Sequence, residues 1–336
     1  RPVISGKYGN ASFRIMPDFA GDTTRIFDAY VDYKFIDELQ FRIGKFKPPV
    51  GLERLQSATD NFFIERGDAT NLAPNRDLGA QISGELIPGQ LEYQFAVVNG
   101  NEDLGNTNTD IDDEKDFVGR VFAQPFAESD IVDLQGLGIG IAGTYGKRDG
   151  STTNRGVAQY KTFGQNTFFT YNANSFADGD KWRVYPQAYW YDGNIGFIGE
   201  YAYTSEDITN GLTHETLTHD AWNVAASYVL TGEDVNFKGS VKPAEDFDIT
   251  GSGWGAFELV GRYGETNIDK DAFPIFASAA TQASSQQSFG IGLNWYLNQS
   301  AKFMLDLNHT TFEGGAAGGS DRGDENALFS RVQYKF

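Results

Sequence analysis

The chain has 336 residues and a formal net charge of −19, an acidic balance that argues against a nucleic-acid binder, whose surface must displace cations from phosphates. Cysteine is absent, which excludes a disulfide framework and thiolate metal sites. No apolar run reaches the roughly 18 residues of a membrane-spanning helix, although 14% of the residues are aromatic.

From the first residues onward, short segments alternate between apolar and polar side chains and are separated by turn residues. In 25–35, for example, Phe27, Val31 and Phe35 alternate with Asp28 and Asp32. Such alternation places the two sets on opposite faces of a β-strand. The pattern predicts fifteen strands, at 1–8, 11–17, 25–35, 38–47, 78–87, 91–99, 116–126, 136–146, 181–191, 194–205, 217–231, 253–265, 286–298, 301–312 and 325–336.

The connections alternate between short turns and long loops, which is typical of an antiparallel transmembrane β-barrel of the bacterial outer membrane. Since such single-chain barrels have even strand numbers, we expect sixteen strands, with the first upstream of Arg1. The expected architecture is a single all-β domain over 1–336. Loops 48–77 and 147–180 carry apolar residues of their own, so we expect both to fold into the lumen.

Alternation also assigns the charged strand residues to a face, and basic candidates for the lumen outnumber acidic ones. A lumen of that composition is more positive than the whole chain and favours anions, although opposite charges that merely pair across the lumen are the alternative. The basic candidates on strands are Arg1, Lys7, Arg14, Lys34, Arg42, Arg120, Arg183, Arg262, Lys302, Arg331 and Lys335. The acidic ones are Asp18, Asp28, Asp32, Glu85, Glu92, Glu200, Glu258 and Asp306, and loop 48–77 adds Arg54, Arg66 and Arg76.

The sequence offers little for catalysis or for a cofactor. Its histidines are His214, His219 and His309, and no serine nucleophile stands at a defined spacing from them. The acidic cluster 110–116 lacks the glycine and spacing of an EF-hand loop. We therefore expect no catalytic residue, no metal site and no cofactor, and we interpret the acidic cluster as a solvated loop or one bridged to lipopolysaccharide by cations.

Four segments resemble the phosphate-selective porin O and P family. They are FRIGKFKPPVGLE at Phe41–Glu53, LTGE at Leu230–Glu233, WGAFELVGRY at Trp254–Tyr263 and GLNWYLN at Gly292–Asn298. The resemblance implies a homotrimer of sixteen-stranded barrels in outer-membrane lipid, each with a pore narrowed by infolded loops. It also implies anion-binding lysines at the constriction, onto which Lys45 and Lys47 match, whereas the family's arginine ladder has no residue-by-residue match here.

The expected function is passive diffusion of small hydrophilic solutes, with a preference for anions such as phosphate. The residues expected to line the pore are Lys47, Lys45, Arg42, Arg14, Lys34, Arg54, Arg66, Arg76, Arg120, Arg183 and Arg262. Alternation puts Lys45 on the outward face unless the strand bulges there. Lys47 is therefore the lysine whose position in the pore depends less on such a bulge. The alternatives are a general or sugar-preferring porin, and an outer-membrane enzyme or surface receptor.

Overall fold

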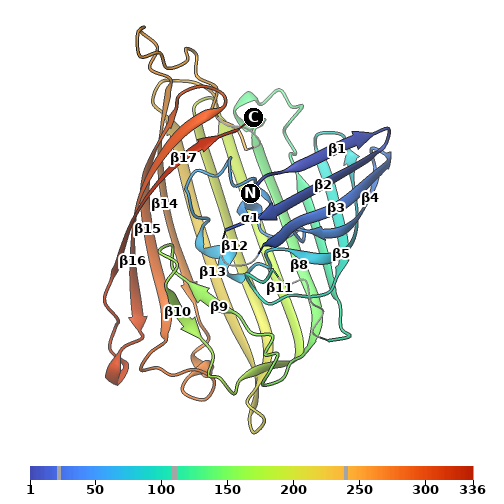
Figure 1. Cartoon of the computed structure of the whole chain (residues 1–336), viewed down its shortest axis with the longest axis vertical. Coiled ribbons are helices and arrows are strands. Elements are labelled where there is room, and N and C mark those ends of the chain that lie inside the picture. The colour runs from blue at the N-terminus through green and yellow to red at the C-terminus, as the bar shows by residue number, and fades with distance from the viewer. Residues whose placement is uncertain (21–23, 107–111, 238–240, 336) are drawn as a thin grey trace.

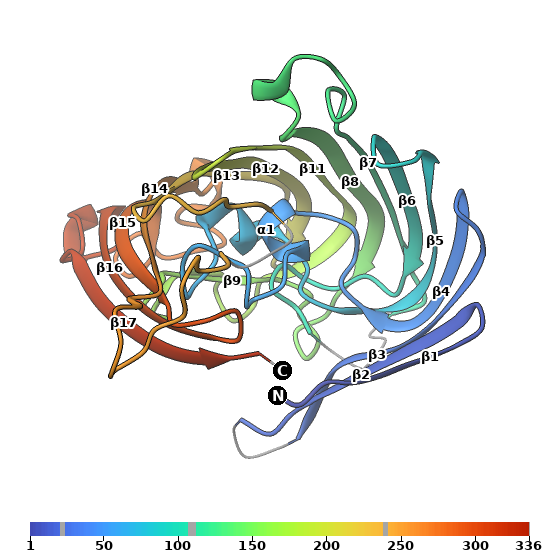
Figure 2. The ribbon, with the colours of Figure 1, turned by 90° about the horizontal axis from the view of Figure 1, so that it is seen from above.

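The computed structural model describes residues 1–20, 24–106, 112–237 and 241–335. Its main element is one sheet of 15 strands in which every strand pairs antiparallel with its neighbours along the chain, apart from a hairpin inserted after β8. Seen from above, the sheet curls into a ring, and the two chain ends lie close together where β17 approaches β1 (Figure 2).

The strands of this sheet confirm the predicted all-β class and match the predicted strands one by one, with ends that differ by a few residues. Their bounds are β1 Ile4–Tyr8, β2 Ala11–Asp18, β3 Arg25–Ile36, β4 Leu39–Phe46, β5 Asp77–Ile87, β6 Leu91–Val98, β7 Asp116–Ala123, β8 Leu137–Asp149, β11 Phe176–Asp192, β12 Ile195–Thr209, β13 His214–Val229, β14 Ala256–Asn267, β15 Ala283–Tyr296, β16 Ala301–Gly314 and β17 Glu325–Tyr334. The expected sixteenth strand lies outside the described residues, as does the terminal Phe336.

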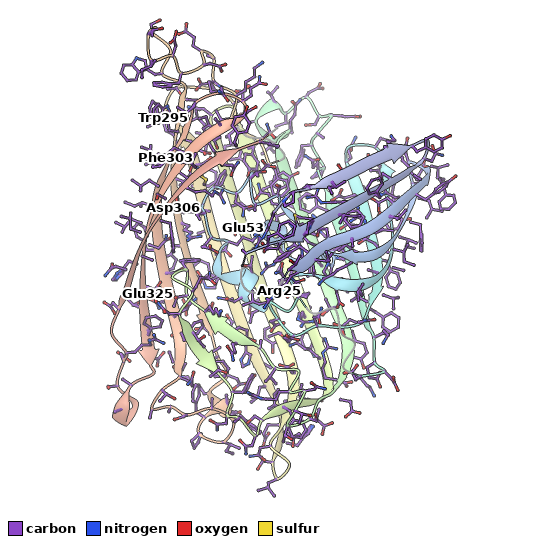
Figure 3. All side chains as sticks on the ribbon, viewed as in Figure 1. Arg25, Glu53, Trp295, Phe303, Asp306 and Glu325 are labelled. Carbon is purple, nitrogen blue, oxygen red and sulfur yellow. The ribbon has the colours of Figure 1, made fainter. Side chains whose placement is uncertain are left out.

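The two faces of the sheet differ as the alternation predicts. In β16, Leu305 and Leu307 are exposed on the outside, whereas the residues that alternate with them, Met304, Asp306 and Asn308, are buried. An outward apolar face and an inward polar face are what a strand needs between lipid and a hydrated lumen. Figure 3 shows Trp295 and Phe303 along the outer edge of the β14–β16 wall.

The remaining elements are short and lie in the connections. They are the helix α1 (Leu52–Leu55), the 3₁₀ turns η1 (Asp68–Leu72), η2 (Val132–Leu134), η3 (Lys270–Ala272) and η4 (Ala317–Gly319), and the hairpin β9 (Gln159–Lys161) with β10 (Thr167–Thr170). In the part of the chain that is described, no helix is both long and apolar enough to cross a membrane. The β9–β10 hairpin was not expected, because its strands of three and four residues are too short to show alternation.

Candidate functional site: the lumen and the segment inside it

Residues 47–76, between β4 and β5, form what we call the inner segment. It carries α1 and η1, and α1 lies inside the ring of strands (Figures 1 and 2). Wall carboxylates accept hydrogen bonds from its backbone: Glu200 from the amides of Leu52 (2.6 Å) and Glu53 (3.2 Å), and Asp306 from the amide of Ile64 (2.6 Å). The first amides of a helix have no partner within the helix, so Glu200 satisfies two groups that burial would otherwise leave unpaired.

Further contacts hold the second half of the inner segment. Asp68 accepts hydrogen bonds from Gln286 (2.8 Å) and from the hydroxyl of Ser288, both on β15. Phe62 and Phe63 pack into a buried cluster with side chains of the wall. The inner segment is thereby attached to the β12–β16 side of the ring, and the open space lies towards β1–β5.

That space is a cavity of about 1080 Å³ with a strongly basic lining. Three of its arginines come from the inner segment itself, Arg54, Arg66 and Arg76, and a fourth is Arg25 at the start of β3, which Figure 3 labels. The remaining charged lining residues are Arg1, Lys161, Arg331, Glu65, Glu102 and Asp103. Cations therefore outnumber carboxylates around this cavity.

Arg54 and Arg66 differ from most cations of the lumen, because their hydrogen-bond partners are neutral. Arg54 donates to the carbonyl of Thr70 (2.8 Å), and Arg66 donates to the carbonyls of Glu53 (2.7 Å) and Gln56 (3.0 Å). Within the described residues, neither forms an ion pair with a carboxylate. Carbonyl partners fix the position of a guanidinium without cancelling its charge, which stays available to a solute.

Other predicted site residues are neutralised by nearby acids. Asp28 forms ion pairs with both Arg14 (2.9 Å) and Arg76 (3.2 Å). Arg42 pairs with Asp32 (2.6 Å), so the basic patch expected along β2–β4 is a row of ion pairs. Lys34 is not part of this row: it pairs with Asp37 (2.5 Å) and is exposed at the end of the β3–β4 hairpin.

Lys45 and Lys47 both turn towards the protein interior. Lys45 is buried and its ammonium donates to the carbonyl of Asn106 (3.4 Å). The face that alternation assigns to it changes at Gly44, whose φ of 128° no other residue type adopts readily. Lys47 donates to the carbonyls of Leu55 and Gln56. Burial, and then the charges of Arg66, Arg76 and Arg54, lower the pKa of Lys47 to about 6.

Three predicted pore-lining arginines lie behind the cavity rather than on it. Arg183 is fully buried and forms an ion pair with Asp103 (2.7 Å). Arg262 donates to the carbonyl of Glu65 (2.6 Å) and so attaches the inner segment to β14. Arg120 pairs with Glu92 (2.5 Å) in a different cavity.

Loop 147–180 also enters the ring, through its β9–β10 hairpin. Tyr160, Phe168 and Phe169 of this loop are fully buried, so their rings are unavailable to a solute. Glu325 on β17 holds the hairpin by accepting hydrogen bonds from Thr162 (2.7 Å), Gly164 (3.1 Å) and Asn166 (2.8 Å).

Two cavity residues on a strand were assigned to the wrong face by the alternation. Arg25 and Phe27 stand in the register assigned to lipid, yet both line the cavity. The pairing of β2 with β3 shifts between Met16 and Pro17, so Phe27 is an extra residue in its strand. Such a bulge changes which face the flanking side chains occupy, and Pro17 is the one sequence signal that could have indicated it.

The histidines do not form a reactive arrangement. His219 is buried within β13, where its ring contacts the hydroxyl of Tyr171 (2.6 Å) and the amide of Asp269 (3.1 Å). Over the described residues, no group of three acidic or histidine side chains could hold a metal ion. The expected acidic loop falls partly on residues 107–111, which lie outside the described part.

Comparisons with known proteins agree with this geometry. The model of the family "Phosphate-selective porin O and P" matches residues 3–336. Porin O of Pseudomonas aeruginosa is 26% identical, over 92% of this chain and 73% of that protein. The outer membrane channel DcaP of Acinetobacter baumannii has a similar fold, with a TM-score of 0.63 at 13% identity over 99% of this chain and 83% of DcaP. An anion-selective porin from Comamonas acidovorans has a TM-score of 0.59 at 10% identity, over 97% of this chain and 84% of that one.

Proposed function

Because this chain belongs to the phosphate-selective porin O and P family, we propose that its lumen conducts small hydrophilic anions, phosphate or a similar oxyanion, across a bacterial outer membrane. The chain is a porin and not an enzyme. The anion-selective porin of Comamonas acidovorans has a similar fold, and the relative in Pseudomonas aeruginosa is a porin by name.

The observation that carries the proposal is the pair of arginines with neutral partners. Arg54 and Arg66 line the 1080 Å³ cavity, and their hydrogen bonds go to carbonyls, so no carboxylate is bonded to either guanidinium within the described residues. A fixed charge in a narrow pore acts on every passing ion, whereas distant loop charges are screened by salt beyond roughly 10 Å. The acidic excess of the whole chain is therefore compatible with a preference for anions.

We further propose that loops 48–77 and 147–180 set the narrowest part of the pore together. The inner segment is hydrogen-bonded to the β12–β16 side of the ring. The β9–β10 hairpin contacts the inner segment, because Asn71 donates to the carbonyl of Lys161 (3.2 Å). Among the expected site residues, Arg54 and Arg66 act directly on the solute in this proposal, whereas the charge of Arg76 is balanced by Asp28. Lys47 contributes where it is protonated, and Arg14, Arg42, Lys45, Arg183 and Arg262 shape the wall.

The membrane environment that we propose for the chain follows from the side chains exposed on the outer face of the sheet. Its apolar residues fit the lipid of the outer membrane, with lipopolysaccharide around the outer loops, as a multi-pass barrel requires. We propose a homotrimer as the assembled form, which cross-linking of the detergent-extracted protein would test.

Single-channel recording in planar bilayers tests the transport proposal. Under a tenfold potassium chloride gradient, the reversal potential should indicate that chloride is more permeant than potassium, and added phosphate should reduce the chloride current. A pore without charge preference would instead support the general-porin alternative, and a protein without conductance would support a receptor.

A further inference from the structure

A second cavity lies on the other side of the inner segment. It has a volume of about 350 Å³ and is lined on one side by the beginning of that segment, from Leu52 to Asp60. Its other lining residues are Glu92, Gln94, Arg120 and Phe237. A smaller adjoining hollow shares Glu92, Arg120 and Phe237 and adds Phe122 and Tyr189. The two hollows adjoin at these three residues, and we call them together the aromatic chamber.

Stacked aromatic rings form one wall of this chamber. The Phe237 ring lies almost parallel to that of Tyr189, with centroids 4.5 Å apart and an interplanar angle of 14°. Phe122 packs on the other side of Tyr189, at 5.2 Å. Gln56 of the inner segment donates to the backbone carbonyl of Phe237 (3.0 Å), which ties this ring to the inner segment. Phe237 is only half-buried and lines both hollows, so part of its ring is open to a solute.

Polar groups face the rings without leaving a net positive charge. Arg120 donates to Gln187 (3.1 Å) and forms its ion pair with Glu92, whose side chain is 41% exposed. Gln94 lies within 3.5 Å of the same guanidinium. A carboxylate, an amide and a guanidinium offer acceptors and donors together. This contrasts with the arginine-lined cavity, where positive charge is in excess.

We propose that the aromatic chamber binds neutral polyhydroxylated ring solutes, that is, sugars. The C–H face of a sugar ring is apolar and fits the open face of Phe237, while its hydroxyls reach Glu92, Gln94 and Arg120. An anion gains little here, because the cation of the chamber is already paired. The lumen then holds two sites of different chemistry in series: arginines that select charge, and an aromatic chamber that retains neutral sugars.

The test is the block of ion current by glucose and by maltose in planar bilayers. Both sugars should reduce the wild-type conductance in a saturable way, whereas glycerol at the same osmolality should lower it only in proportion to viscosity. Phe237→Leu keeps an apolar side chain but removes the ring, and should raise the half-blocking concentration about tenfold. Phe237→Trp should lower it.

A matched control comes from the same connection. Phe247 packs on Trp295 (5.0 Å) and lines neither hollow, so Phe247→Ala should leave the sugar block unchanged. Gln94→Leu is a second variant, and it lies on β6 rather than in the connection that carries Phe237. It should also weaken the sugar block. The inference is overturned if wild-type current shows no saturable block, or if Phe237→Leu and Gln94→Leu block like wild type. The reversal potential without sugar is read in the same channels, so anion preference and sugar binding can each fail independently.

Discussion

Replacing Arg66 by Gln removes one cation from the arginine-lined cavity, and this cation has no ion-pair partner. An anion about 4 Å from a cation interacts by about 1 kcal/mol in bulk water and by about 4 kcal/mol at an effective dielectric of roughly 20. Arg66 is half-buried beside a water-filled cavity, so we take a value near the lower limit, about 1 to 1.4 kcal/mol. That corresponds to a five- to tenfold fall, roughly, in the occupancy of the pore by anions.

The assay is the reversal potential of single channels under a tenfold potassium chloride gradient. The ratio of chloride to potassium permeability should fall by about the same five- to tenfold in Arg66→Gln. Arg66→Lys, which keeps the charge but loses part of the hydrogen bonding to Glu53 and Gln56, should stay close to wild type. Lys147→Gln removes an exposed cation from the outward-facing register of β8 and serves as the control. Equal reversal potentials for Arg66→Gln and wild type would refute the role given to this arginine.

Three further predictions concern the parts around Arg66. Because the pKa of Lys47 is lowered to about 6, this lysine is positive below pH 6 and neutral above it, so anion selectivity should fall between pH 5 and pH 8; Lys47→Met should abolish that step, and an identical pH profile in the variant would contradict it. Deleting most of 53–70 should raise the single-channel conductance, since the inner segment occupies the ring, and a folded deletion variant with unchanged conductance would argue against a constriction there. Glu325→Ala removes the acceptor of three hydrogen bonds from the β9–β10 hairpin, so the hairpin should move within the pore and produce additional conductance levels. A variant with the same single conductance level as wild type would contradict this prediction.

The strands could be predicted from the sequence because every strand that crosses the membrane is subject to the same constraint on its two faces. Lipid on one side and a hydrated lumen on the other force alternation along every strand, as Leu305, Asp306 and Leu307 of β16 illustrate. The same alternation fails where the backbone departs from regular pairing. The bulge at Phe27 and the unusual conformation of Gly44 each change the face of nearby cations.

The lumen could be predicted only in part, because alternation gives the face of a charge and not its partner. Arg183 and Arg66 are both cations near the lumen, yet Arg183 meets Asp103 from a loop 80 residues away, whereas Arg66 meets carbonyls of its own segment. Likewise, Phe237 belongs to the connection between β13 and β14, and its stacking on Tyr189 has no local signature in the sequence. Pairing between distant segments is decided by the fold as a whole.

The central claim is that the arginines of the inner segment that are not ion-paired, Arg54 and Arg66, make this lumen selective for anions. Its most direct test is the reversal potential of the wild-type channel compared with that of a double variant, Arg54→Gln with Arg66→Gln. We expect wild-type channels to favour chloride over potassium and the double variant to lose that preference while keeping an open pore. A wild-type channel that favours potassium, or a double variant that remains as anion-selective as wild type, would contradict the account.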